Sequence, residues 1–222
     1  MHVGDSASVL TICAGDPPAG PLSPYAESLH ARWGIGREAV AQRRLEDITA
    51  CQNMGASARH LSIPDCIYRR SEDGVPLYDS ENAIFGLLSP VEASLVQALG
   101  SQLERELAGG IRLVCPLALG GHVDHRLTRA AAEQSGQPLW YYADYPYVLK
   151  EADHLNQLRL LGWDAVSFPV SERGMRAWVK AVAAHASQIS TFWPDLDTMH
   201  AALAEYRAQN EGILLWQPLS LR

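Results

Sequence analysis

The sequence has few cysteines, no long apolar run and no signal-like start, and each absence excludes a class of protein. Its four cysteines stand singly with no Cys-x-x-Cys pair, so zinc-ribbon and thioredoxin-like interpretations have no support. No apolar stretch reaches the roughly 18 residues of a membrane span. The N-terminus lacks the basic start and apolar core of a signal peptide. We therefore expect a cytoplasmic protein with reduced, structural cysteines and no membrane contact.

Basic residues are also too few for a general nucleic-acid binder. Lys and Arg number 18 against 25 Asp and Glu, which gives a formal net charge of −7, whereas nucleic-acid binders carry a basic face. No Gly-x-Gly-x-x-Gly or P-loop follows any predicted strand, so a nucleotide-binding domain is disfavoured. The 222 residues, 47% of them hydrophobic, suffice for one good-sized core. We predict a single domain over residues 1–222, without nucleic-acid partners.

Apolar runs and helical periodicities alternate along the chain, which predicts an α/β fold with a Rossmann-like, doubly wound and mostly parallel sheet. Between them, residues 71–89 are rich in Gly, Asp, Ser and Pro, and loops of that length are usually functional or mobile. After Pro146 we expect irregular chain until residue 171. The predicted strands are 9–14, 59–63, 111–115, 139–143 and 213–216, and the predicted helices are 37–54, 90–108, 124–134, 171–186 and 196–209.

The densest cluster of chemically active residues follows the apolar run 111–119. Gly120-Gly121 permits a sharp turn, and His122, Asp124 and His125 come directly after it. Ligands of open α/β folds gather beyond the carboxyl ends of strands. One interpretation is that Asp124 caps a helix and the histidines are surface residues. The other is a site that binds a divalent metal or moves protons. The preceding strand, the glycines and the carboxylate favour a site, although a metal needs at least three protein ligands.

Two further segments leave alternatives open. The aromatic cluster 141–147 is either a packed rim or a stacking wall for a polar substrate. Arg43, Arg44 and Glu46 on the predicted helix 37–54 form either a solvated face or a guanidinium site for an oxygen-rich ligand.

Six segments together resemble the PIG-L (LmbE-like) family of zinc-dependent N-deacetylases. The His-x-Asp-His turn at 122–125, followed by Asp-x-Pro-Tyr at 144–147, is specific as an ordered pair, and the others support it. The resemblance implies a metal-dependent amide hydrolase that removes acetyl groups from an amino-sugar-type or similar small polar substrate. The matching segments are 9–18, 43–47 with 54–56, 63–69, 116–125, 141–147 and 186–188.

The same resemblance implies a role for each site residue. His125 would be the zinc ligand, His122 an acid or electrostatic helper, and Asp124 its neighbour in the catalytic group. Zinc in such a site activates water and polarises the acetyl carbonyl. Arg43, Asp65 and Asp144 would lie on the substrate side. The implied partner is an N-acetylated sugar derivative, and a homo-oligomer is one possible assembly.

The chain departs from the family at its start. The family begins with a strand and a His-Pro-Asp-Asp motif that carries two zinc ligands and the general base, and this sequence has no Asp-Asp pair. His2 and Asp5 have the wrong spacing to replace it. We therefore expect the family's first strand and helix to be missing. Two hypotheses follow: an enzyme whose competence depends on further N-terminal residues, or a non-catalytic or truncated member that binds a sugar or partner without hydrolysis.

Overall fold

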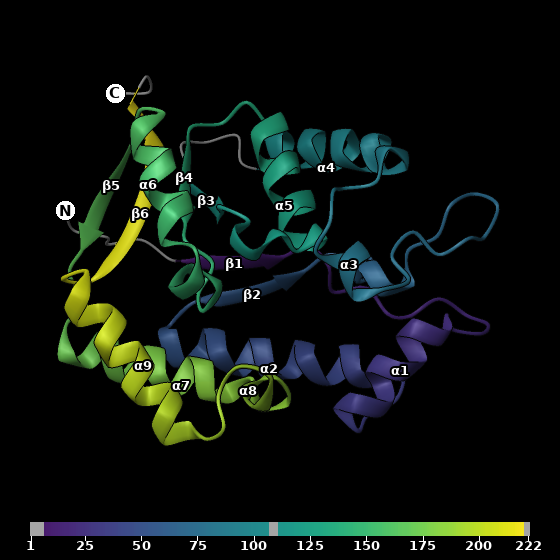
Figure 1. Cartoon of the computed structure of the whole chain (residues 1–222), viewed down its shortest axis with the longest axis horizontal. Coiled ribbons are helices and arrows are strands. Elements are labelled where there is room, and N and C mark those ends of the chain that lie inside the picture. The colour runs from purple at the N-terminus through teal and green to yellow at the C-terminus, as the bar shows by residue number, and fades with distance from the viewer. Residues whose placement is uncertain (1–6, 107–110, 220–222) are drawn as a thin grey trace. The chain divides into compact units, whose positions relative to one another are not determined.

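A computed structural model describes residues 7–106 and 111–219 and divides them into two compact units (Figure 1). Unit 1 holds the chain up to Arg69 together with Pro169–Gly212, and unit 2 holds Arg70–Phe168 together with the chain from Ile213. Helices and strands alternate, so the predicted α/β class is confirmed. His2, Asp5 and the predicted helix end at residue 108 lie outside the described residues.

Unit 1 is built on a parallel strand pair, β1 (Ser8–Thr11) and β2 (Ser57–His60), joined through helix α2 (Ala39–Met54), which packs against β2. Helix α2 ends at Gly55, whose φ of 71° is the left-handed conformation that closes many helices. The predicted strand and helix are thus present, with the second strand two residues earlier than expected.

Helices make up the remainder of unit 1. Helix α7 packs against both α2 and α9, and η1 contacts α1. Helix α1 begins at Pro24, because Ser23 caps its first turn and Pro24 fixes its first backbone angle. The bounds are α1 Pro24–Trp33, η1 Cys66–Tyr68, α7 Glu172–Ala184, α8 Ala186–Phe192 and α9 Leu196–Gln209.

Unit 2 contains a four-stranded sheet in the order β3-β4-β6-β5. The β3–β4 pair is parallel, as in a doubly wound fold, whereas β6 runs antiparallel to both of its neighbours. Helix α5 connects β3 to β4 and packs against β3 and α4. The bounds are α4 Ala93–Glu106, β3 Leu113–Pro116, α5 Val123–Gln134, β4 Leu139–Tyr142, β5 Trp163–Phe168 and β6 Ile213–Pro218.

The prediction of irregular chain after Pro146 is wrong. The segment forms η4 (Tyr147–Lys150), α6 (Ala152–Leu160) and strand β5, which pairs along its whole length with β6. Since β6 lies about 45 residues further on, the pairing that defines β5 has no local sequence signal.

The long segment 71–89 is tied down rather than loose. Tyr78 donates its hydroxyl proton to the buried carboxylate of Glu92 and accepts a hydrogen bond from the Ser89 amide at 2.9 Å. Segment 71–89 contains the short helix α3 (Glu81–Ile84) and leads into η2 (Pro90–Glu92). Among the described helices, none combines the length and apolar character needed to cross a membrane.

Candidate functional site

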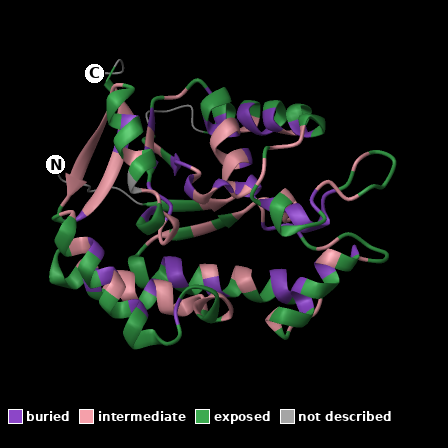
Figure 2. Ribbon diagram, viewed as in Figure 1, coloured by how far each residue is buried: buried purple, intermediate pink, exposed green. Residues whose placement is uncertain are grey.

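The Gly-Gly turn lies at the carboxyl end of β3 in unit 2, within η3 (Leu119–Gly121). Gly120 and Gly121 have φ of 76° and 77°, the left-handed region that side chains rarely adopt. A Cβ added at Gly120 would lie 2.5 Å from Cδ1 of Tyr147. Leu119 and Val123 are both buried and anchor the two sides of the turn in the core. Figure 2 colours the buried parts of the chain purple. The turn therefore requires glycine and holds the following histidines in a fixed place.

His125 lies on the first turn of α5 and is paired with a buried carboxylate. Its Nδ1 is 2.5 Å from Oδ1 of Asp144, whose side chain is 1% exposed, while the His125 side chain is 36% exposed. The other carboxylate oxygen of Asp144 accepts a hydrogen bond from the Leu119 amide at 3.0 Å. The carboxylate that orients the His125 ring is therefore Asp144.

His122 is the N-cap of α5. Its Nδ1 accepts a hydrogen bond from the Asp124 amide at 3.3 Å. The helix is thus capped by a histidine and not by the Asp124 carboxylate. A ligand atom of His122 and one of Asp124 lie within 4.8 Å of each other. The His122 ring and the Asp124 carboxylate accordingly belong to one small polar group at the N-terminus of α5.

Two aromatic rings flank the histidines. Phe85 meets His122 edge-on with 5.4 Å between ring centroids, and Tyr147 meets His125 edge-on at 6.0 Å. The two histidine rings are 5.4 Å apart. Sequence analysis did not identify Phe85, because a single aromatic in a Gly- and Ser-rich stretch carries no signal of its spatial neighbours. Burial, and then the nearby Asp144 carboxylate, raise the pKa of the Tyr147 hydroxyl, which stays neutral near pH 7.

The aromatic cluster 141–147 is interpreted from the sequence either as a packed rim or as a stacking wall for a substrate, and its members differ in this respect. Tyr141 is buried and donates its hydroxyl proton to Glu133 at 3.3 Å, as a packed rim requires. Tyr147 instead borders the histidines. Within the cluster, Tyr147 therefore lies where a substrate wall could be.

Arg43 and Asp65, both expected on the substrate side, are brought together in unit 1. The guanidinium Nη1 of Arg43 is 3.8 Å from Oδ2 of Asp65, and the guanidinium lies 4.2 Å above the Trp33 ring. Asp65 also caps η1 by accepting from the Ile67 amide at 3.2 Å. Of the six predicted site residues, these two belong to unit 1 and the other four to unit 2.

A buried histidine that the sequence did not single out lies beside this pair. His30 Nε2 is 2.6 Å from the Tyr68 hydroxyl, and both residues are buried. Burial, followed by the positive charges of Arg37 and Arg43, lowers the pKa of His30. Burial raises the pKa of Tyr68 to about 12. Both groups are thus neutral near pH 7.

The remaining polar residues of segment 43–47 act as structural tethers. Arg44 binds the Ala14 carbonyl and the Asp16 carboxylate, each at 2.7 Å. Glu46 accepts from both the amide and the hydroxyl of Ser187, at 3.0 and 2.7 Å. For Arg44 and Glu46, the solvated face suggested by the sequence is therefore replaced by long-range contacts.

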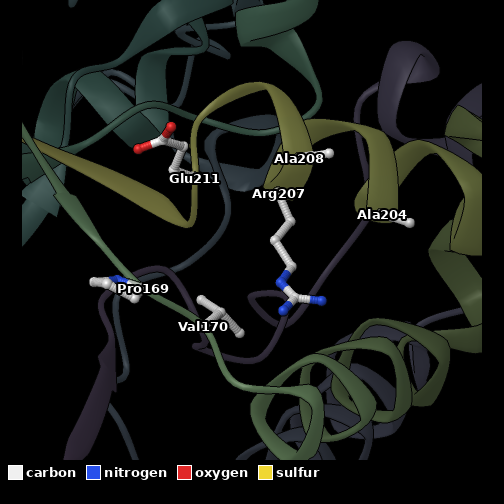
Figure 3. Close-up of a pocket in the computed structure, with 6 residues that line it drawn as sticks. All are labelled: Pro169, Val170, Ala204, Arg207, Ala208 and Glu211. Carbon is white, nitrogen blue, oxygen red and sulfur yellow. The ribbon is translucent and has the colours of Figure 1, made fainter.

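A surface pocket of unit 1 offers little chemistry (Figure 3). Arg207 extends into it toward Val170, but its guanidinium is already paired with Glu172 at 2.6 Å. The lining contains neither histidine nor cysteine. It is formed by Pro169, Val170, Ala204, Arg207, Ala208 and Glu211.

The fit of unit 2 to a metal ion is partial. Within the described part of this unit, no three His, Cys, Asp or Glu side chains bring their ligand atoms together. The second nitrogen of His125, on a one-third exposed side chain, is suited to be one imidazole ligand. Any further ligands must come from outside this group.

Comparisons with known proteins show that this chain is similar to deacetylases. No family model matches the chain. A 130-residue stretch, 56% of this chain, is 31% identical to the 2'-N-acetylparomamine deacetylase of Streptomyces fradiae, and covers 44% of that enzyme. Among solved structures, the zinc-inhibited form of teicoplanin deacetylase Orf2 superposes with a TM-score of 0.78 at 25% identity, over 94% of this chain and 85% of that one.

A second solved structure extends the agreement. The A40926 pseudoaglycone deacetylase Dbv21 superposes with a TM-score of 0.68 at 28% identity, over 96% of this chain and 84% of that one. The α/β fold is therefore that of these deacetylases, and the similar proteins are of the PIG-L (LmbE-like) type. The chain nevertheless spans less than half the length of its curated relative.

Proposed function

We propose that this protein is a metal-dependent N-deacetylase whose substrate is an N-acetylated amino sugar or a glycoconjugate that carries one. The observation that carries the proposal is the His122–His125 pair, held at a strand end by the Gly-Gly turn and a buried carboxylate. The similar proteins support it, because they include a 2'-N-acetylparomamine deacetylase and teicoplanin deacetylase Orf2. Under this proposal residues 1–222 form a single deacetylase domain.

Each residue of the turn has a proposed task. His125 would contribute one ligand to zinc through Nε2, and the chemistry that a bound zinc ion supplies is activation of water and polarisation of the acetyl carbonyl. His122, 5.4 Å away between ring centroids, would donate a hydrogen bond to the oxygen that becomes negative during acyl transfer. Asp124, next to His122, would complete this polar group.

The assay that tests this proposal is acetate release from an N-acetylglucosamine conjugate, with and without added zinc. We expect zinc-dependent release, and we expect His122→Ala to lower kcat/KM by roughly 10²–10⁴-fold, the usual contribution of a positioned proton donor. His200→Ala, which changes an exposed histidine of α9, serves as the matched control. In protein that includes the residues encoded upstream of Met1, acetate release that is absent with zinc, or unchanged in the His122 variant, would contradict the proposal.

A non-catalytic role is the second candidate, and the incomplete ligand set in the described part of unit 2 favours it. Such a protein would bind the sugar or a partner without hydrolysing it. The reading frame upstream of Met1 separates the two, since an in-frame His-Pro-Asp-Asp motif favours the enzyme. If protein that includes those upstream residues binds no zinc, the enzyme proposal fails. A cytoplasmic location and a homo-oligomer remain part of the proposal.

A further inference from the structure

The Asp144 carboxylate is placed to control its neighbours rather than to meet solvent. It follows β4, its side chain is 1% exposed, and its backbone carbonyl accepts from the Val148 amide at 3.0 Å. Its two oxygens contact different elements: Oδ1 meets His125 of α5 and Oδ2 accepts from the Leu119 amide of η3. With both oxygens engaged inside the protein, the side chain has little capacity left for a substrate.

The contact to His125 fixes which ring nitrogen carries the proton. A carboxylate only accepts hydrogen bonds, so the 2.5 Å contact places a proton on Nδ1 of His125. In the neutral ring the lone pair is then on Nε2. A metal binds that lone pair, and a carboxylate on the opposite nitrogen both orients the ring and raises its basicity.

His122 is set to the opposite tautomer by its helix. Its Nδ1 accepts from the Asp124 amide, so that nitrogen carries the lone pair and the neutral ring carries its proton on Nε2. Two adjacent imidazoles with centroids 5.4 Å apart thus differ in function. One presents a lone pair and the other an N–H donor.

We infer that Asp144 is a positioning residue that commits His125 to the Nδ1–H tautomer and presents Nε2 as the metal-binding nitrogen, with His122 held in the complementary tautomer by the first turn of α5. The part concerning metal rests on the proposed function. The part concerning tautomers does not. Under this inference, Asp144 has a positioning role in place of the substrate contact that the resemblance implied.

Nitrogen-15 NMR of the metal-free protein, labelled at histidine and recorded at about pH 8, above the ordinary histidine pKa of about 6.5, tests the tautomers directly. We expect the His125 signals of an Nδ1–H ring and the His122 signals of an Nε2–H ring. An Nε2–H ring at His125 overturns the inference. This measurement needs no variant, so a folding failure cannot obscure it.

The Asp144→Asn variant tests the cause. The asparagine oxygen can accept from the Leu119 amide while its NH₂ group donates to Nδ1 of His125, which reverses the tautomer and moves the proton to Nε2. We expect this reversal together with zinc binding that is 10–100-fold weaker by calorimetric titration, the usual effect of removing such a partner. Circular dichroism checks that the variant is folded.

Asp47→Asn is the matched control, because it makes the same change beside His60, 2.7 Å away in unit 1. It should leave both the His125 signals and the zinc affinity unchanged. If Asp144→Asn folds and retains the Nδ1–H ring, the positioning role is wrong. If the tautomers are as stated but no form of the protein binds zinc, the positioning role stands and the metal-dependent function fails.

Discussion

The two units use histidine in different ways. In unit 1, His30 and His60 are each bound through Nε2, to the Tyr68 hydroxyl at 2.6 Å and the Asp47 carboxylate at 2.7 Å. In unit 2, His125 is bound through Nδ1, and its side chain is 36% exposed against 17% for His60. A histidine bound through its outer nitrogen is tied into the structure. One bound through its inner nitrogen presents the outer nitrogen for chemistry.

The comparison shows that a His–Asp pair does not by itself define a site. His60 and Asp47 have the same two groups at nearly the same distance, and Asp47 also accepts from the Thr11 hydroxyl at 3.0 Å, which ties α2 to both strands of its sheet. The pair at His125 differs in the glycine turn that precedes it and in the second histidine beside it.

The largest expected difference comes from replacing one histidine in each unit. We expect His125→Gln to lower deacetylase activity by more than about 100-fold. The same variant should weaken zinc binding at least as much as Asp144→Asn does. His60→Gln should leave both unchanged and cost about 1 kcal/mol of unfolding free energy, the usual value of one hydrogen bond. Urea unfolding and zinc titration of both variants make the comparison. Equal losses of zinc affinity would remove the distinction between the two pairs.

A second, smaller difference concerns the backbone that carries His125. Gly120 and Gly55 have nearly the same φ, 76° and 71°, but an added Cβ contacts Tyr147 at the first and nothing within 4 Å at the second. Gly55→Ala should therefore lower the free energy of unfolding by about 1 kcal/mol, because only the strained backbone conformation of the alanine contributes. Gly120→Ala should cost roughly 2–3 kcal/mol, because overpacking against the ring is added to that strain.

Equal urea unfolding midpoints for the two alanine variants would show that the Gly120 turn accommodates the added methyl group without further loss of stability. The Gly120 turn would then not be the rigid support that the His125 pair requires. If the costs differ as expected, the rigidity of the turn is specific to unit 2.

Local signals explain most of what the sequence predicted. Gly55 stops α2 where a C-cap glycine should, and α9 occupies residues 196–209 as expected. The Gly-Gly-His-x-Asp-His turn was identified because its glycines, carboxylate and histidines are contiguous. The α/β class followed from the alternation of apolar runs and helical periodicity.

Long-range contacts explain what the sequence could not predict. Strand β5 depends on pairing with β6, and the partner of His125 is 19 residues away on another element. Glu46 and Ser187, which belong to two segments of the family resemblance, meet across 141 residues. No periodicity reports such pairs, so their roles as tethers emerged only from the structure.

The smallest expected effect is a pH dependence carried by unit 1. Burial and the charges of Arg37 and Arg43 lower the pKa of His30 below its unfolded value of about 6.5. The folded state therefore binds fewer protons than the unfolded one as the pH falls below 6.5. Stability that is fully present above that pH is lost as the pH falls through the lowered pKa.

Unfolding of wild type and His30→Gln in urea at pH 7.5 and pH 5.5 measures this contribution. Between pH 7.5 and pH 5.5, the free energy of unfolding of wild type should fall by up to about 1 kcal/mol more than that of the variant. This is less than the roughly 1.4 kcal/mol that a pKa shift of one unit represents. His30 Nε2 and the Tyr68 hydroxyl share one hydrogen bond in a buried place, where a charged imidazole loses its hydration and is penalised. An identical pH response in both proteins would mean that His30 is charged without penalty, and unit 1 would then not use its buried histidines as neutral hydrogen-bonding partners.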